Sequence, residues 1–181
     1  MYGLIDSGLG AIGVAKEYKL ENFIIIMDKS FFPYGKKTKF FLLCRSVYLC
    51  EYLFNYCDSI LLACNTLSII VLPFLKLRYK DKIRGIIDNL LVYSNKDTVF
   101  LGTSNTIKYL NERYYPYPCL ECDELIRKIE KKEEDTAICI QNIDNIIPKG
   151  CTILLGCTHF LNIRDKFNHH TLVPKNPFIL P

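Results

Sequence analysis

The sequence predicts an α/β fold with a duplicated strand–helix framework, because one short run is used twice. Residues 59–66 read SILLACNT, and residues 152–159 read TILLGCTH. Runs of four or five apolar residues closed by Ala or Gly are typical of buried parallel strands. The stretches 2–10 and 98–106 are each an apolar run followed by a glycine-containing turn. They are separated by nearly the same number of residues as the two cysteine runs. We therefore expect two similar halves, a first domain over 1–90 and a second over 91–181.

The first half is expected to open with a strand at 2–5 that ends in a glycine-rich turn at 6–10. Pro33-Tyr34-Gly35 favours a turn, and Thr66 is placed as the cap of the helix after the first cysteine. Pro73 is expected to kink or stop that helix. The other elements expected here are helices at 11–18, 39–56 and 67–79, strands at 23–27, 59–63 and 84–87, and a connection at 88–97.

The second half repeats this order. A strand at 98–101 is expected to lead into the polar turn at 102–106, and a helix to continue to about 113. Because parallel strands carry their ligand-facing loops at one edge of the sheet, the turns of both halves are expected to face a ligand. The remaining elements expected are helices at 125–132 and 136–146, the second cysteine strand, a helix to about 167 and a short tail at 172–181.

Composition excludes several classes of protein. Of the 181 residues, 50% are hydrophobic, which is ample for a core, and a net charge of +4 is too mildly basic for a nucleic-acid partner. The longest apolar stretch, 68–77, is interrupted by Pro73 and is too short to cross a bilayer. Nine cysteines in a chain that opens without an export signal predict a reducing compartment. We therefore expect a soluble cytoplasmic protein with no membrane partner.

Two further motifs suggest alternative functions that we consider less favoured. Gly8, Gly10 and Gly13 match the dinucleotide-binding spacing GxGxxG, but the acidic residue Asp6 beside them does not suit a pyrophosphate. Cys119-x-x-Cys122 has no second cysteine pair, so we expect no metal. Five other cysteines are interpreted as core or surface thiols: Cys44, Cys50, Cys57, Cys139 and Cys151.

The two repeated cysteines, Cys64 and Cys157, are expected where a strand ends and a helix begins. At that position, first-turn N–H groups and the helix dipole favour thiolate over thiol. A single buried cysteine is most often a core residue. Two copies, each followed by hydrogen-bonding side chains, favour a paired site instead.

Five motifs in order carry a resemblance to a known family: Asp6-Ser7-Gly8, Pro33-Tyr34-Gly35, Cys64-Asn65-Thr66 with Ser68, Gly102-Thr103 with Thr106, and Gly156-Cys157-Thr158-His159. Together they resemble glutamate racemase, of the cofactor-independent aspartate/glutamate racemase superfamily. The resemblance extends to about Val173. It implies two pseudo-symmetric, three-layer, flavodoxin-like domains with the active site in the cleft between them. It also implies a role in supplying D-glutamate for peptidoglycan.

The chemistry explains why two thiols are needed. Racemisation removes a weakly acidic Cα proton and returns a proton to the opposite face, so one base is needed on each face. The resemblance implies that Cys64 serves D-glutamate with help from Asp6, and that Cys157 serves L-glutamate with help from His159. The side chains and backbone it assigns to substrate binding are Asp6, Ser7, Tyr34, Gly35, Asn65, Thr66, Thr103, Thr106, Thr158 and His159. No lysine stands out as a Schiff-base partner, so no cofactor is expected.

The chain also departs from the family. Relatives continue well past the last cysteine motif, and their tail completes the first domain. We therefore expect apolar surface on that domain, covered by a second copy in a homodimer or by the end at 178–180. A glutamate that supports the second cysteine in the family has no clear counterpart, although Glu124 and Glu130 are nearby in the sequence. Two alternatives follow: a racemase or isomerase for aspartate or another small acid, or a shortened relative that binds without catalysis.

Overall fold

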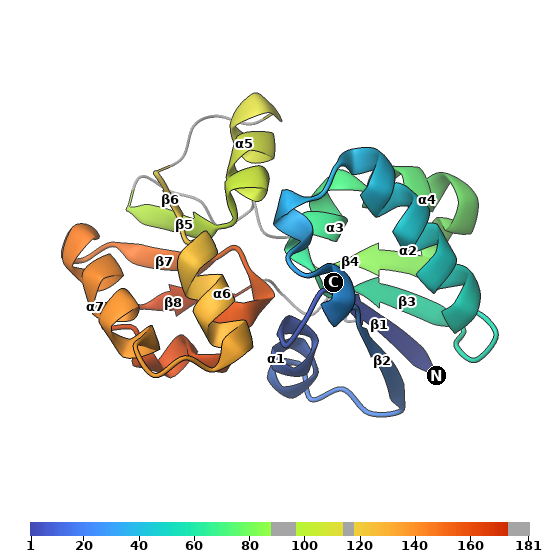
Figure 1. Cartoon of the computed structure of the whole chain (residues 1–181), viewed down its shortest axis with the longest axis horizontal. Helices are drawn as coiled ribbons and strands as arrows, with labels where there is room; N and C mark the ends of the chain where they lie inside the picture. Colours follow the sequence, from blue (N-terminus) through green and yellow to red (C-terminus); the bar gives the residue numbers. More distant parts are fainter. Residues whose placement is uncertain (88–96, 114–117, 174–181) are drawn as a thin grey trace.

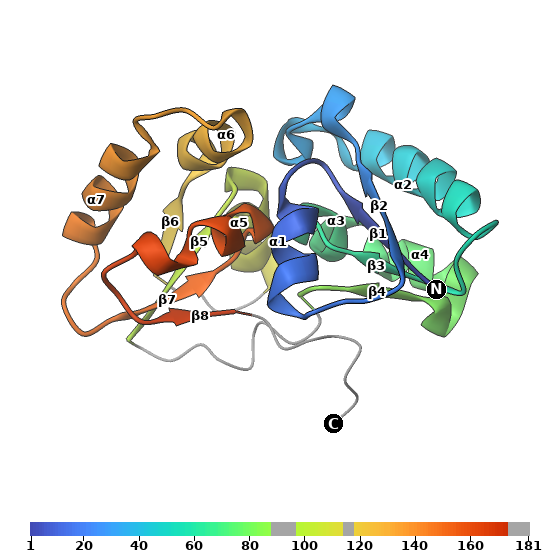
Figure 2. The same ribbon diagram turned by 90° about the horizontal axis from the view of Figure 1, so that it is seen from below.

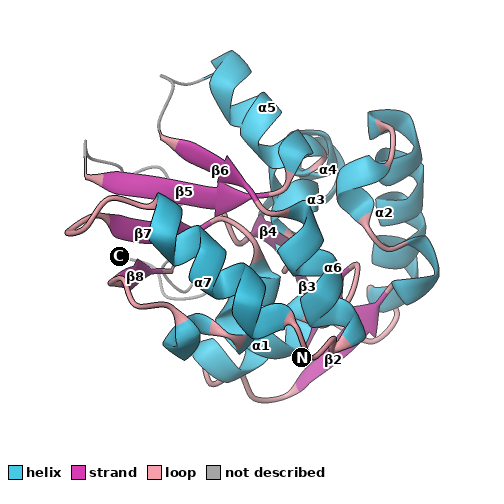
Figure 3. Cartoon of the chain, turned by 60° about the vertical axis from the view of Figure 1, so that its left-hand side comes forward, coloured by secondary structure: helices cyan, strands magenta, loops and turns pink. Residues whose placement is uncertain are grey.

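Two four-stranded parallel sheets form the molecule (Figures 1 and 3), in a computed structural model that describes residues 1–87, 97–113 and 118–173. The first sheet has the order β2-β1-β3-β4 and the second the order β6-β5-β7-β8, so each strand of one sheet has a counterpart in the other. This confirms the predicted α/β fold and its duplication. The strands are β1 (Tyr2–Asp6), β2 (Phe23–Met27), β3 (Ser59–Leu62), β4 (Ile83–Gly85), β5 (Thr98–Gly102), β6 (Cys119–Glu121), β7 (Thr152–Leu155) and β8 (Thr171–Leu172).

Helices connect the strands and cover both faces of each sheet. The α-helices are α1 (Gly10–Glu17), α2 (Lys39–Leu53), α3 (Asn65–Ile70), α4 (Leu72–Tyr79), α5 (Ser104–Arg113), α6 (Asp123–Lys131) and α7 (Thr136–Ile146). Short 3-10 helices are η1 (Lys29–Phe31), η2 (Tyr34–Lys36), η3 (Lys80–Lys82), η5 (Thr158–Asn162) and η6 (Arg164–Lys166). Figure 2 places α1 between the two sheets.

Alternation along the strands divides the core into three clusters. Ile60 and Leu62 of β3 pack with the buried faces of α2 and α4, whereas Leu61 between them points the other way. Leu61 belongs to a cluster that also contains Phe100 and Leu154 of the second sheet. The third cluster lies between the second sheet and helices α6 and α7. The cluster that contains Leu61, Phe100 and Leu154 therefore joins the two halves and fixes how their loops face each other.

The proposed division at residues 90 and 91 lies outside the described residues, and so does most of the connection expected at 88–97. Each sheet lies within one of the two predicted halves. The domain boundaries themselves stay a prediction.

Several predicted helices and strands have different bounds in the structure. α3 begins at Asn65, with Cys64 at the N-cap position, so Thr66 lies inside the helix and does not cap it. The predicted stop near Pro73 is confirmed, because α3 ends at Ile70 and Pro73 lies in the first turn of α4. β4 covers Ile83–Gly85 instead of 84–87, and α2 ends at Leu53, three residues early.

The second half differs more from expectation. The helix predicted after Cys157 is two short 3-10 helices, η5 and η6. Cys119–Glu121 forms β6, which was not predicted, and Thr171–Leu172 forms β8 where the tail was expected to begin. Both strands are too short to show alternation, and their pairing with β5 and β7 supplies the hydrogen bonds that define them.

Apolar surface is partly open along the edge of the first sheet. β2 is an edge strand of sequence FIIIM, and all five of its residues are only half-buried. The segment 178–180, expected to cover such a surface, lies outside the described residues. In the described part of the chain, none of the helices has the length and apolar character that crossing a bilayer would require.

Candidate active site

The two cysteines occupy equivalent places in the two halves. Cys64 follows β3 at the N-cap position of α3, and Cys157 follows β7 at the N-cap position of η5. Both side chains are nearly buried, and β3 and β7 are the equivalent central strands of their sheets. The predicted location at a strand–helix junction is confirmed for both thiols. This is the edge of a parallel sheet where ligands bind in such folds.

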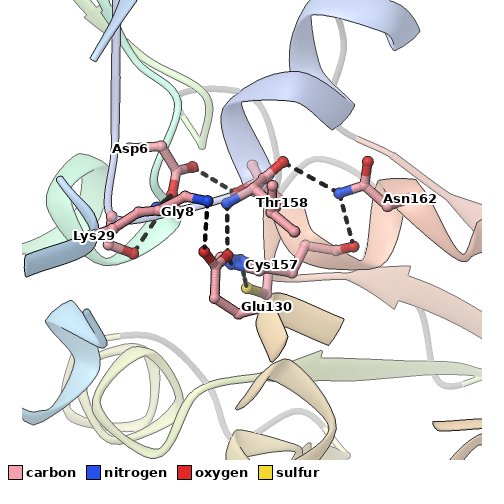
Figure 4. Close-up of polar contacts among 10 residues, drawn as sticks. Asp6, Gly8, Lys29, Glu130, Cys157, Thr158 and Asn162 are labelled. Atoms are coloured by element: carbon pink, nitrogen blue, oxygen red, sulfur yellow. Dashed lines mark hydrogen bonds and ion pairs between the residues drawn. The ribbon is translucent and has the colours of Figure 1, made fainter. Parts of the chain in front are cut away.

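Asp6, at the end of β1, connects the two cysteine loops. Its carboxylate accepts a hydrogen bond of 2.9 Å from the Thr158 hydroxyl, which is next to Cys157, and one of 3.0 Å from the Gly8 N–H. Burial raises the pKa of Asp6, although these hydrogen bonds and His159 act in the opposite direction. The same carboxylate acts electrostatically on the Cys64 thiol. Figure 4 shows Asp6 and Thr158 meeting beside the Gly8 turn.

His159 connects Cys157 to a glutamate. The ring Nδ1 lies 3.5 Å from the Cys157 sulfur, and Nε2 lies 3.0 Å from Oε2 of Glu130 on α6. Burial alone would lower the pKa of His159, but Cys157, Glu130 and Asp6 together raise it to about 10. His159 is therefore charged at neutral pH.

Glu130 is the functional residue that the sequence left unassigned. Its carboxylate accepts a 2.6 Å hydrogen bond from the Leu9 N–H of the first half and lies 3.7 Å from the Lys29 ammonium. Glu124, the other candidate, is largely exposed and pairs with Lys128. In Figure 4, dashed lines mark the contacts that the Glu130 carboxylate makes with the first half. Glu130 thus orients His159 and holds the two halves together.

The glycines of the first turn are needed for close approach. A Cβ at Gly8 would lie 2.3 Å from a carboxylate oxygen of Glu130, and one at Gly10 would lie 2.3 Å from the Thr158 hydroxyl. Side chains of the second half therefore occupy the space above this turn, where a dinucleotide phosphate would bind. The GxGxxG spacing reflects contact between the halves, so the nucleotide interpretation is wrong.

The remaining predicted binding residues also gather here, on loops of both halves. A Cβ at Gly35 would lie 3.3 Å from the Cβ of Thr103, so the Tyr34–Gly35 turn packs against the loop after β5. The hydroxyl of Thr103 donates to that of Thr106 at 2.9 Å. Ser7 is buried next to Asp6, and its hydroxyl lies 3.4 Å from the carboxylate.

Asn65, directly after Cys64, is buried with both amide atoms unpaired. A buried amide without a hydrogen-bond partner costs about 1–3 kcal/mol, so such groups usually have a ligand or water to bind. The N–H groups of Thr66 and Leu67 point toward the Cys64 sulfur. Asn65 is therefore the described residue with the clearest capacity to bind a substrate.

The expected activation of Cys64 by its helix is wrong. Burial raises the pKa of the Cys64 thiol, and the negative charge of Asp6 raises it further. The backbone N–H groups of Thr66 and Leu67 act in the opposite direction but are weaker. A positive group of a ligand is therefore needed to favour the thiolate.

A second cluster, not predicted from the sequence, fixes Tyr34. Its hydroxyl donates a 2.5 Å hydrogen bond to Asp28, and Arg45 of α2 donates to both oxygens of Asp28 at 2.7 and 2.8 Å. Burial alone would raise the pKa of Asp28, but Arg45 and Tyr34 hold it below its ordinary value. The Tyr34 hydroxyl is therefore engaged by Asp28, which anchors the turn that carries Gly35.

We expect Arg45→Met to lower the free energy of unfolding by about 2 kcal/mol at pH 7, because it leaves a buried carboxylate without its cation. The loss should shrink in acid. The pKa of Asp28 is lower in the folded protein than in the unfolded chain, so its ionised carboxylate stabilises the fold above roughly pH 3.9. This stabilisation disappears as the pH falls through the pKa that Asp28 has in the folded protein. Urea unfolding at several pH values measures the loss of free energy of unfolding. Arg78→Met, which breaks the exposed pair with Glu51, is the matched control and should cost below ~1 kcal/mol. Equal losses in the two variants would contradict this role for Arg45.

The CxxC pair does not join the site. Cys119 is half-buried in β6, and Cys122 is buried at the N-cap position of α6, where its thiol points to the Leu120 carbonyl. Among residues 1–87, 97–113 and 118–173, no three His, Cys, Asp or Glu side chains are grouped so that they could hold a metal ion.

Comparison with known proteins identifies proteins of similar sequence and similar fold. No protein-family model matches the sequence. The chain is 30% identical to the glutamate racemase of Buchnera aphidicola subsp. Acyrthosiphon pisum (strain 5A) over an alignment of 182 positions, gaps included. The alignment covers 87% of this chain and 70% of that protein.

Solved structures are similar in fold. Glutamate racemase from Thermus thermophilus, in complex with β-chloro-D-alanine, has a TM-score of 0.80 at 20% identity, over 96% of this chain and 75% of that one. The Escherichia coli enzyme, in complex with L-glutamate and the activator UDP-MurNAc-Ala, has a TM-score of 0.74 at 24% identity, over 94% and 76%. The fold is thus that of the aspartate/glutamate racemase superfamily. Within it, the chain belongs to the glutamate racemase family.

Proposed function

We propose that the protein interconverts L-glutamate and D-glutamate by a two-base mechanism that uses Cys64 and Cys157. The observation that carries this proposal is the position of Asp6, which accepts a hydrogen bond from Thr158 beside Cys157 and lies close enough to Cys64 to act on its thiol. Two nearly buried thiols at equivalent strand ends suit a reaction with one proton transfer on each face of a carbon.

Each direction of the reaction moves two protons. From L-glutamate, the Cys157 thiolate takes the Cα proton and becomes a thiol, while the Cys64 thiol returns its proton to the opposite face and becomes a thiolate. The reverse reaction starts with Cys64 as the thiolate. His159, with its ring Nδ1 3.5 Å from the Cys157 sulfur, is the positive group next to the base that acts on L-glutamate. The substrate ammonium provides a positive charge that opposes the effects of burial and of Asp6 on Cys64.

The substrate-binding groups hold the ammonium and the two carboxylates of glutamate. We assign this task to the unpaired amide of Asn65, to backbone N–H groups of the Tyr34–Gly35 turn, and to nearby hydroxyls. Donors fixed in advance stabilise the charge that develops as the Cα proton leaves. The hydroxyls are those of Ser7, Thr66, Thr103, Thr106 and Thr158.

Deuterium exchange tests the activity directly. The protein is incubated in heavy water with D- or L-glutamate and no added cofactor, and we expect deuterium at Cα together with the opposite enantiomer. Aspartate in place of glutamate tests a preference for the smaller acid. Binding of glutamate without exchange would contradict the proposal and favour a non-catalytic relative.

In the cell, we propose that the protein works in the cytoplasm and supplies D-glutamate for peptidoglycan. Complementation of a strain that requires D-glutamate tests this role: growth without added D-glutamate is expected. Failure to grow with a protein that is active in vitro would contradict the role and leave the activity standing. A homodimer, expected from the sequence, stays a prediction.

A further inference from the structure

Two neighbouring aromatic residues of the first half pack into different parts of the core. Phe31 ends η1, and Phe32 follows it just before the Tyr34–Gly35 turn. Phe31 packs against the core of the first half, whereas Phe32 packs against the cluster of the second half that contains Cys157. Pro33 restricts Phe32 to the extended backbone that it has here, so the chain leaves the 3-10 helix at this residue. Phe32 is therefore a side chain of the first half that reaches into the second.

The ring of Phe32 lies beside the ring of His159. Their centroids are 5.6 Å apart, and the two planes are inclined by 46°. Aromatic rings attract each other at this separation, and a cation within about 6 Å of a ring centroid is attracted by that ring. His159 is only 2% exposed and is charged at neutral pH. Phe32 is therefore one of the groups that surround a buried cation.

The same segment of the first half also touches the partner of His159. Lys29 of η1 places its ammonium 3.7 Å from Oε1 of Glu130, and Nε2 of His159 lies 3.0 Å from Oε2 of that carboxylate. The segment 29–32 therefore contacts both members of the pair. Lys29 is largely exposed and reaches the carboxylate, whereas the ring of Phe32 bears on the imidazole directly.

An aromatic ring suits this position better than an aliphatic side chain would. Burial disfavours a charged imidazole, and Cys157, Glu130 and Asp6 act against that effect. An aliphatic side chain beside His159 would only contribute to the burial. A phenyl ring also excludes solvent, but the negative face of its π-system attracts a cation. The ring of Phe32 can therefore cover His159 without opposing its charge.

We propose that Phe32 is a positioning residue of the proposed reaction: its ring covers His159 from the first half and holds the charged imidazole next to Cys157. This role rests on the proposed racemisation by Cys64 and Cys157, and Phe32 acts in it through His159 and not on the substrate. Phe32 belongs to one half and His159 to the other. The surroundings of the base that acts on L-glutamate are therefore complete only when the two halves pack together.

NMR titration of His159 tests the contact without any need for activity. The chain has three histidines, and the resonance that is lost in His159→Gln is assigned to His159. We expect Phe32→Leu to lower the pKa of His159 by about one unit, which is the size of a cation–π contact of a buried group. Phe32→Tyr keeps the ring and should leave the pKa unchanged.

Phe31→Leu is the matched control. It removes the neighbouring ring, which lies 4.8 Å from the Arg45 guanidinium instead, and should leave the pKa of His159 unchanged. The charged groups that face His159 stay the same in all these Phe31 and Phe32 variants: Cys157, Glu130 and Asp6, with Lys29 beyond Glu130. Circular dichroism confirms that the variants are folded.

The pH dependence of kcat/KM tests the role in the reaction. A fall of one unit in a pKa of about 10 predicts about a fivefold loss near pH 10 in Phe32→Leu and almost none near pH 6.5. Phe32→Tyr should restore the native profile. An unchanged pKa of His159 in Phe32→Leu, an equal fall in Phe31→Leu, or a lowered pKa with an unchanged rate profile would overturn the proposal. Absence of deuterium exchange by the native protein would overturn the proposed function instead, and the titration would still report whether Phe32 acts on His159.

Discussion

Cys64→Ser and Cys157→Ser are each expected to reduce the interconversion of D- and L-glutamate by at least ~10³-fold. A serine hydroxyl is far less acidic than a thiol and cannot serve as the base, and loss of a positioned acid or base typically costs 10²–10⁴-fold. The two enantiomers have equal free energies, so kcat/KM must fall by the same factor in both directions. The rate of change of optical rotation, started from each enantiomer, measures this.

Cys122→Ser is the matched control. Like the two candidate bases, Cys122 is buried at an N-cap position directly after a strand, but its thiol donates to the Leu120 carbonyl. We expect this variant to keep its rate within about twofold, and thermal unfolding should show all three variants folded. If either of the first two serine variants kept more than a tenth of the native rate, the two-base assignment would be wrong.

Much of the fold was predictable because it depends on local patterns. The repeated Ile-Leu-Leu runs and the glycine-containing turns gave the duplicated framework and the positions of Cys64 and Cys157 correctly. β6 was not predictable, since a three-residue strand has no alternation of its own and is defined by its pairing with β5. The role of Thr66 as a helix cap was also predicted wrongly. The helix starts two residues earlier, directly after Cys64.

The candidate site was predictable in its residues but not in its electrostatics. The helix N-terminus alone predicts an acidic thiol at Cys64, but the fold buries this thiol next to Asp6, and burial has the larger effect. The pair of Asp28 and Arg45 was missed because the two residues are 17 positions apart on a strand end and a helix. Only the tertiary structure brings them to Tyr34.

Glu130 illustrates the same limit. Its neighbour Ile129 is buried, so the helical pattern places Glu130 at the border of the apolar face of α6. The pattern does not show that this border meets His159 and the Leu9 N–H of the other half. This contact between the halves is the basis of the second large effect that we expect.

We expect Glu130→Gln to move the alkaline limb of the kcat/KM profile to lower pH. His159 has a pKa of about 10, held there against burial by Cys157, Glu130 and Asp6. Glutamine can still accept from the Leu9 N–H, but it removes one negative charge from His159, so the pKa of His159 falls. Activity that needs the charged ring is lost as pH rises through this pKa, and the loss therefore begins earlier in the variant.

The magnitude should depend on pH in a way that a purely structural defect would not reproduce. We expect about a tenfold loss of kcat/KM near pH 9 and a much smaller loss near pH 6.5, where the ring is charged in both proteins. Lys29 and Asp6, the other charged groups that face this cluster, are unchanged in the variant. Glu133→Gln, just past the end of α6, removes a carboxylate that pairs with Arg127 instead and should leave the profile unchanged. A loss that is equal at every pH would mean that Glu130 only holds the two halves together, and that the charge on His159 is not what activates Cys157.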